Sequence, residues 1–354
     1  MTARAACRNL PADVPAFFRQ ACDRFVYLVN EPDRWKSSRD SALAALNPPD
    51  HYFDLEFWGD SKLPDTRYAF LFEAAKRGLI TDAKPVSFMG TAPWTVAEYA
   101  DRLVIHFRQW RETREDTEAD KLVRRQVEEN IIYTAGILAH YVTDLGNPLH
   151  CTIHHNGWRE GAANPRGYLA DKESRNLHAR FESIYVERAV DDKDMAALPA
   201  PRRVGPWMAD TEQFIRRQNG FVEKLFTLEA EGSFGSGKET PEARTFLLAR
   251  LGDAAWMLRD VWNTAWIVSG EQWLNDAVMT YGRTGATALD LLKNFKVETQ
   301  SYDMGKLVIA IGNRRNGLDG RYWHYFVNGQ PGTAAADKFQ TSNGERIEWK
   351  FEKH

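Results

Sequence analysis

The segment Glu115–Leu145 is the feature that most limits how this chain can fold. Its residues recur every three to four positions, as on a helix, and they form two stripes. One stripe holds Val123, Val127, Ile131, Leu138, Val142 and Leu145, and the second holds Tyr133, Ile137, His140 and Asp144. Gly146 and Pro148 then end the helix, because glycine caps a helix C-terminus and proline cannot continue it. A helix filled on two faces packs centrally, so we expect a helical protein built around this segment.

The same periodicity predicts further helices up to about Gly270, where strand patterns are scarce. They cover Val14–Val29, Arg67–Leu79, Val96–Arg111, Arg175–Ala189, Trp207–Ala230 and Pro241–Val268. Thr95 and Glu98 have the spacing of a capping box, which places one helix start at Val96.

Near residue 276 short alternating runs replace the helical pattern. Strands are predicted at Lys306–Ile311, Arg321–Val327 and Glu345–Phe351, with a hairpin turn at Asn328-Gly329. One helix, about Thr287–Phe295, is expected among them. The predicted fold class is therefore mainly α, with a helical domain at residues 1–275 followed by a small α+β domain at residues 276–354.

Composition and short motifs exclude several classes of protein. There are 46 Lys and Arg against 49 Asp and Glu, a formal charge of −3, so the basic excess of a duplex-DNA binder is missing. The longest nearly apolar run, Ile131–Ala139, is far short of the ~18 residues of a membrane span, which argues against an integral membrane protein. Three cysteines allow at most one disulfide, and Cys7 with Cys22 is the candidate pair. Met1–Leu10 lacks the apolar core of a signal peptide.

Four histidines and two acidic residues have spacings suited to metal ligation. His140 and Asp144 lie four apart on one helix, and His178 and Glu182 repeat that spacing on another, so each pair can grip one divalent ion. His150 follows the turn after Asp144, where the chain can fold back toward the same site. Any one such histidine is most often a core or surface residue, but a carboxylate buried on a central helix needs a cation, and a metal supplies one. His51 is the fourth histidine.

The run His140-Tyr-Val-Thr-Asp144-Leu-Gly-Asn-Pro148-Leu-His150, followed by His178-Ala-Arg-Phe-Glu182, resembles the zinc-dependent phospholipase C and single-strand-specific nuclease family. The resemblance covers roughly residues 5–270. It implies an almost entirely helical fold and a site with three zinc ions. It also implies a secreted or periplasmic location.

When the family's zinc ligands are matched to positions of this sequence, the resemblance implies two sets of zinc ligands. The first set is His51, His140, Asp144 and Asp33, where Asp33 would also contact the nucleophilic water as general base. The second set is His150, His178 and Glu182. The family's third zinc uses an N-terminal Trp and a nearby histidine, and this chain begins Met1-Thr-Ala-Arg-Ala instead. We therefore expect two zinc ions here, and expect the natural N-terminus, with a signal peptide, to lie upstream.

The resemblance implies metal-assisted hydrolysis of a phosphate ester, and three functions stay open. A nuclease or nucleotidase acting on single-stranded nucleic acid is the main hypothesis. A phospholipase C acting on lipid phosphodiesters is the alternative, and a non-catalytic secreted binding protein with a vestigial metal site is the second alternative. Candidate substrate contacts are Lys36, His154 and Trp158.

The C-terminal module carries a separate resemblance. Its segments Tyr322–Gly329 and Glu348–Phe351 resemble a β-grasp-like module similar to the C-terminal domain of cobalamin carriers. That likeness implies ligand binding rather than catalysis, with the ligand unknown.

Overall fold

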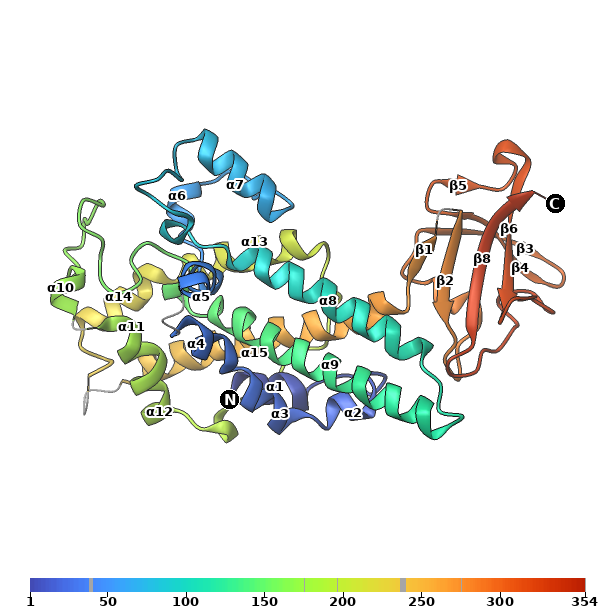
Figure 1. Cartoon of the computed structure of the whole chain (residues 1–354), viewed down its shortest axis with the longest axis horizontal. Coiled ribbons are helices and arrows are strands. Elements are labelled where there is room, and N and C mark those ends of the chain that lie inside the picture. The colour runs from blue at the N-terminus through green and yellow to red at the C-terminus, as the bar shows by residue number, and fades with distance from the viewer. Residues whose placement is uncertain (38–40, 175, 196, 236–239, 275, 354) are drawn as a thin grey trace. The chain divides into compact units, whose positions relative to one another are not determined.

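The computed structural model describes residues 1–37, 41–174, 176–195, 197–235, 240–274 and 276–353. These residues form two compact units. The first unit holds residues 1–106 and 114–265 and is helical. The second holds residues 107–113 and 266–354 and is built mainly from strands, together with the C-terminal ends of two helices (Figure 1). The predicted fold class, a mainly helical chain ending in a small sheet domain, is confirmed. The division into domains at residues 1–275 and 276–354, each folding independently, stays a prediction.

The helices follow one another along most of the chain. Their bounds are α1 Thr2–Arg8, α2 Ala16–Arg19, α3 Cys22–Leu28, α4 Glu31–Lys36, α5 Ser41–Leu46, α6 Leu55–Trp58, α7 Arg67–Lys76, α8 Ala92–Glu112, α9 Glu118–Asp144, α10 Asp171–Ser174, α11 Leu177–Ala179, α12 Val186–Ala189, α13 Trp207–Asn219, α14 Val222–Ala230 and α15 Pro241–Ser269. Short 3₁₀ turns are η1 Pro48–His51, η2 Val86–Phe88, η3 Pro148–His150 and η5 Asp192–Asp194, and η4 Arg180–Tyr185 is a π-helical turn.

Helix α9 lies at the centre of the helical unit, as its two stripes predict. Every residue from Thr134 to Val142 is buried, including Ile137 on one stripe and Leu138 on the other. Trp262 of α15 donates from Nε1 to the Ala135 carbonyl at 3.3 Å, so α15 packs on α9. On another side Gly136 allows α3 to approach, because a Cβ there would lie 2.4 Å from the Cβ of Leu28. The predicted end of α9 before Gly146 is confirmed.

Two details of the helix prediction are wrong. Helix α8 begins at Ala92 rather than Val96, so Thr95 lies inside the helix and does not cap it. The Thr95 hydroxyl donates a hydrogen bond to the Asp50 carboxylate at 2.6 Å instead. Val123 and Tyr133 are 49% and 47% exposed, although their stripes predict burial. The periodicity continues past the part of α9 that the core covers, so these two positions face solvent.

The second unit contains two antiparallel sheets. One sheet has the order β1-β2-β8-β6-β7 and the other β3-β4-β5. The strands are β1 Gln272–Leu274, β2 Ala277–Tyr281, β3 Val297–Tyr302, β4 Gly305–Ile311, β5 Arg314–Arg315, β6 Arg321–Val327, β7 Gln330–Pro331 and β8 Arg346–Lys353. The predicted strands at β4, β6 and β8 are confirmed, and in β8 Ile347, Trp349 and Phe351 alternate into the core. The helix expected at Thr287–Phe295 is only a 3₁₀ turn, Asp290–Leu292.

Two further predictions concern covalent structure and membranes. Cys7 and Cys22 form the predicted disulfide, and Cys151 is a free, buried thiol. Among the described helices, none is both long enough and apolar enough to cross a membrane.

Candidate metal centre

The predicted ligand residues converge in the helical unit as two groups of donor atoms. In one group, donor atoms of Asp33, His51 and His140 all lie within 4.8 Å of one another. In the other, donor atoms of His150, His178 and Glu182 do the same. Asp144 joins the first group, with Oδ2 2.9 Å from His51 Nδ1 and 3.1 Å from His140 Nε2. The structure thus brings together all seven residues of the predicted sets.

The first group is assembled from three separate segments. Asp33 comes from α4, His51 from the turn η1, and His140 and Asp144 from the last turns of α9. Buried Asp50 fixes the η1 turn, because its carboxylate accepts hydrogen bonds from Thr91, Thr95 and Arg67 at 2.6–2.7 Å. Two hydrogen bonds then tie this turn to η3: His150 Nδ1 donates to the His51 carbonyl at 2.7 Å, and Phe53 N donates to the His150 carbonyl at 2.9 Å.

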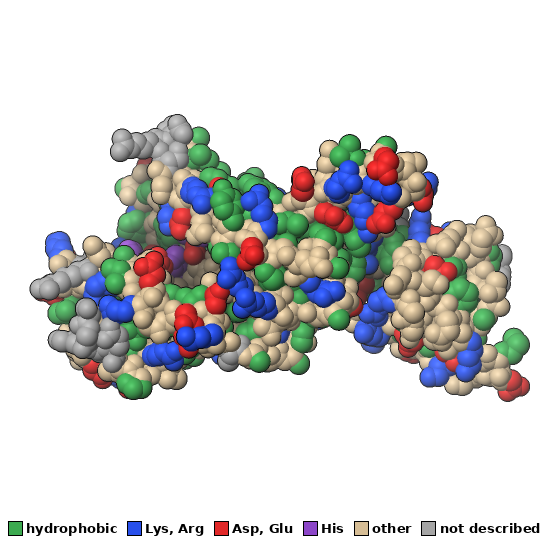
Figure 2. Space-filling model, turned by 90° about the horizontal axis from the view of Figure 1, so that it is seen from below, with side chains coloured by type: hydrophobic (Ala, Val, Ile, Leu, Met, Phe, Trp, Pro, Cys, Tyr) green, Lys and Arg blue, Asp and Glu red, His purple; other side chains and the backbone are tan. Residues whose placement is uncertain are grey.

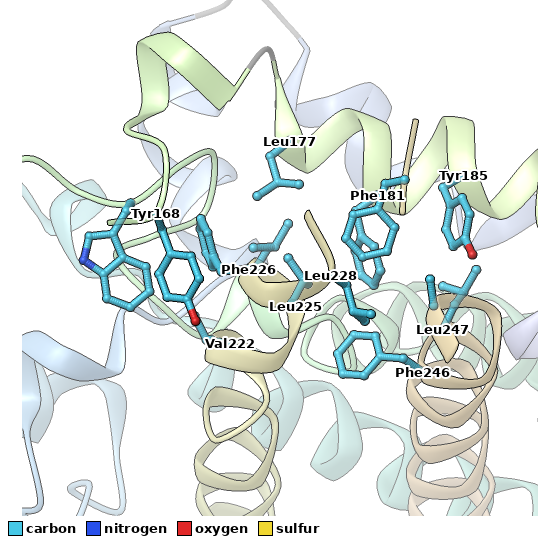
Figure 3. Packing of buried hydrophobic residues seen from close by; sticks show 14 of the residues in the cluster. Tyr168, Leu177, Phe181, Tyr185, Val222, Leu225, Phe226, Leu228, Phe246 and Leu247 are labelled. Carbon is cyan, nitrogen blue, oxygen red and sulfur yellow. The ribbon is translucent and has the colours of Figure 1, made fainter. Parts of the chain in front are cut away.

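The second group depends on a hydrophobic core beneath it (Figure 3). Leu177, Phe181 and Tyr185 recur every four residues and point into the cluster formed with α14 and α15. His178 and Glu182 each follow one of these anchors, so they share a neighbouring face. Glu182 lies in the π-helical turn η4, a local irregularity that is frequent at functional sites. Packing of the anchors therefore orients the two ligand residues.

In the second group the positions of the histidine ring protons leave both Nε2 lone pairs available to a cation. A carbonyl oxygen only accepts, so the Nδ1 atoms of His150 and His178, bonded to the carbonyls of His51 and His155, must carry the ring protons. In neutral rings each Nε2 then presents a lone pair. These two atoms lie 3.0 Å apart and 3.1 and 3.0 Å from Glu182 Oε2. Three electron-pair donors at such distances require a proton or a metal ion between them.

The first group also holds electron-pair donors close together. His140 Nδ1 donates to the Val29 carbonyl at 2.6 Å, so its Nε2 lone pair faces His51 Nδ1 at 2.9 Å and Asp144. His51 Nε2 is buried and has no hydrogen-bond partner among the described residues. A tetrahedral zinc site with bonds of about 2.0–2.1 Å separates its ligand atoms by about 3.3 Å. The separations of 2.9–3.9 Å in this group bracket that value, so both donor sets fit zinc.

The electrostatics of the two groups favour positive charge between the carboxylates. Burial opposes ionisation of Asp144, but His140 and His150 outweigh it and hold the pKa of its carboxyl well below the usual range. Burial also opposes ionisation of Glu182, whose pKa is nevertheless lowered by hydrogen bonds to His150 and His178. Burial lowers the pKa of His150, yet Asp144 and Glu182 raise it overall to about 9. The site therefore attracts a proton that a metal ion would displace.

A pocket of about 310 Å³ opens beside the donor atoms. Its lining includes donors from both groups, together with Lys36, Tyr52, Asp54, Phe88 and Arg159. Figure 2 shows histidine side chains at the bottom of a hollow in the surface. Lys36 binds Asp33 at 2.8 Å. Burial, with help from Glu56, raises the pKa of Asp54 to about 8 against the opposing charges of Arg159 and His150.

His154 and Trp158, two predicted substrate contacts, are not brought into this pocket. They stack on each other at 3.9 Å between ring centroids, and both are at least 92% buried. Trp158 packs on Phe226 in the hydrophobic core, and its Nε1 donates to the Ala163 carbonyl. Their loop position predicts exposure, but the loop folds back on the core. These side chains support the loop rather than face a substrate.

Sequence reasoning missed several residues of the pocket wall, among them Tyr52, Asp54, Phe88 and Arg159. Tyr52 and Asp54 directly flank the His51 motif, so proximity in sequence could have identified them. Arg159 follows Trp158 in the loop between ligand residues, and only the fold shows that its side chain reaches the pocket. Phe88 had no signal, since residues 86–88 carry no motif.

Comparison with known proteins gives limited matches. Residues 285–353 match a family described as a domain of unknown function, DUF4430. No curated protein matches the sequence. Similar solved structures include alpha toxin from Clostridium absonum, with 12% identity and a TM-score of 0.38, and Clostridium perfringens alpha-toxin from an avian strain, with 10% identity and a TM-score of 0.39. Each alignment covers 99% of this chain and 80% of the toxin. Identity and TM-score are low, so function has to be inferred from the donor atoms.

Proposed function

We propose that the helical unit is a zinc-dependent hydrolase of phosphodiester bonds. The observation that carries this proposal is the triangle of His150 Nε2, His178 Nε2 and Glu182 Oε2, with sides of 3.0–3.1 Å and both Nδ1 protons committed to backbone carbonyls. Nitrogen and carboxylate ligands in such a set are typical of zinc. The first donor group adjoins this triangle through Asp144, whose Oδ2 lies 3.9 Å from His150 Nδ1. Two metal positions side by side suit phosphodiester hydrolysis.

The roles of the residues follow from their positions. His51, His140, Asp144 and Asp33 would hold one zinc ion, and His150, His178 and Glu182 the other. Zinc in these positions supplies Lewis acidity that polarises phosphoryl oxygens and makes a water molecule more acidic. Asp33 has a side chain 53% exposed, so it can reach that water as general base. Lys36, bound to Asp33, is placed to contact a phosphate oxygen.

The substrate is a phosphate ester, and two classes fit the donor atoms. Single-stranded nucleic acid or a nucleotide is one, and a phospholipid phosphodiester is the other. A secreted location, and two zinc ions per chain rather than three, belong to the same proposal. The pocket wall next to the donor atoms would select between the substrates.

The test removes the metal with a chelator and then measures whether added zinc restores hydrolysis. Release of p-nitrophenol from bis(p-nitrophenyl) phosphate and from p-nitrophenyl phosphorylcholine is measured before chelation, after chelation and after zinc is returned. We expect turnover that chelation abolishes and zinc restores. Turnover unaffected by chelation would contradict the role of zinc. Bound zinc without turnover of either ester would favour the non-catalytic alternative.

A further inference from the structure

Arg159 is a cation of the pocket wall that has no carboxylate partner. Within the part of the chain that the structure describes, no Asp or Glu oxygen lies within 4.0 Å of its guanidinium nitrogens. The guanidinium instead lies over the rings of Phe57 and Phe88, 5.0 Å from each centroid. The two rings contact each other at 5.4 Å, so they form one apolar support for the charge.

Two carboxylates of this region, Glu56 and Asp54, make no ion pair with Arg159. Glu56 is occupied elsewhere, accepting from the Thr152 hydroxyl at 2.6 Å, from Asn219 Nδ2 at 2.8 Å and from Ile153 N at 3.0 Å. Asp54 lines the same pocket but makes no ion pair with Arg159. By contrast, Arg67, which is also partly buried in this unit, binds Asp50 and Glu98. Arg159, which has no carboxylate partner and lies in the pocket beside the two donor groups, is therefore available to bind an anion.

The loop that carries Arg159 is held rigidly. The Arg159 backbone N donates to His154 Nδ1 at 3.0 Å, and His154 stacks on buried Trp158. The side chain is therefore presented from a fixed backbone, which reduces the entropy lost when a ligand binds. A planar guanidinium recognises phosphate with two parallel hydrogen bonds.

We propose that Arg159 forms an anion subsite beside the metal centre, which binds the phosphate that flanks the scissile one in single-stranded nucleic acid. This proposal rests on the phosphodiester hydrolysis proposed above and names its substrate class. A strand of three or more nucleotides places one phosphate after another, so a second anion flanks the scissile phosphate. Phe88 and Tyr52 of the same wall offer aromatic surfaces on which a base can stack. A choline headgroup, which is cationic, would meet Arg159 with like charge.

The experiment compares substrates that differ only by a flanking phosphate. Zinc-loaded protein is given the dinucleotide thymidylyl-thymidine and its 5′- and 3′-phosphorylated forms, and kcat/KM is measured for each. Binding of thymidine 3′,5′-bisphosphate and of thymidine 5′-monophosphate is measured by calorimetry, which needs no turnover. The variants are Arg159→Ala and Arg159→Lys, and the control is Arg166→Ala, an exposed residue of the same loop that pairs with Glu223.

We expect the native protein to prefer one phosphorylated dinucleotide by about tenfold or more, as a charged hydrogen-bond pair allows. Arg159→Ala should remove that preference and weaken bisphosphate binding, with a much smaller effect on hydrolysis of the unphosphorylated dinucleotide than on that of the phosphorylated one. Arg159→Lys should keep part of the preference, and Arg166→Ala all of it.

Three results would overturn the subsite. The native protein could show no preference, Arg159→Ala could slow all dinucleotides equally, or short-chain phosphatidylcholine could be hydrolysed faster than every dinucleotide. Failure of the proposed function looks different, because then no phosphodiester is hydrolysed by the zinc-loaded native protein.

Discussion

His51 Nδ1 and His140 Nε2 lie 2.9 Å apart, although the two residues are 89 positions apart in the chain. Each ring is held from its own element, His51 by the η1 turn and His140 by the Val29 carbonyl. Asp144 Oδ2 is 2.9 and 3.1 Å from the same two nitrogens. So close an approach of donor atoms requires a proton or a metal ion between them. This arrangement is the geometric basis of the first zinc position proposed above.

Replacement of His178 by Ala should release zinc from the second donor set and remove nearly all activity. Glu182 and His150 would keep only two of the three donors, too few for a stable zinc site. The measurements are the zinc content per chain, by elemental analysis, and the rate of hydrolysis of bis(p-nitrophenyl) phosphate. The control is His324→Ala in the strand unit, which should lose neither zinc nor activity. Unchanged zinc content in the His178 variant would contradict its assignment.

Gly136→Ala should disturb the first donor set without touching a ligand. The added Cβ would lie 2.4 Å from the Leu28 Cβ, and overpacking of this kind costs about 1–3 kcal/mol. Pushing α3 away also moves the Val29 carbonyl that orients His140. We expect a lower melting temperature and weaker zinc binding. Gly252→Ala in α15 is the matched control, since its Cβ meets nothing within 4 Å and alanine favours a helix by up to about 1 kcal/mol. Equal effects of the two variants would refute this mechanism.

Asp54→Asn should change how stability depends on pH. The pKa of Asp54 is raised to about 8 in the folded protein, mainly by burial, so the folded state keeps a proton that the unfolded state loses near pH 4. Stability of the native protein therefore falls relative to the variant between about pH 4 and pH 8, by at most about 1.4 kcal/mol per pH unit, and levels off above pH 8. Urea unfolding of both metal-free proteins across this range measures the difference. A difference that does not vary with pH would show that Asp54 is ionised throughout.

The strand unit should be dispensable for hydrolysis. It has its own hydrophobic core, which includes Val278, Trp323 and Trp349, and the described residues of 276–353 contribute no donor to either group. A chain shortened to residues 1–275 should therefore bind zinc and hydrolyse bis(p-nitrophenyl) phosphate at the native rate. An insoluble or inactive shortened chain would show that the helical unit depends on the strands.

Five of the candidate ligand residues could be predicted from the sequence because their spacing is local. His140 with Asp144, and His178 with Glu182, each occupy one helix face, and the turn at Pro148 returns His150 to the first pair. His51 and Asp33 needed a family resemblance, since no spacing links them to the others. The strands in the C-terminal unit were predicted for the same local reason, their alternation of buried and exposed residues.

The errors arise where tertiary contacts override local pattern. Thr95 has the spacing of a cap but bonds to Asp50, and α8 starts earlier. Trp158 and His154 lie in a loop, where exposure is expected, yet they pack on Phe226 in the core. Arg159 was missed because nothing in its local sequence shows that Phe57 and Phe88 support it. Contacts between segments far apart in the chain decide these positions.

The most direct test of a two-zinc centre is X-ray diffraction from crystals of the zinc-loaded protein, recorded above and below the zinc absorption edge. The account predicts one anomalous peak among Asp33, His51, His140 and Asp144, and a second among His150, His178 and Glu182. Zinc peaks elsewhere in the molecule, with none at either donor set, would contradict it.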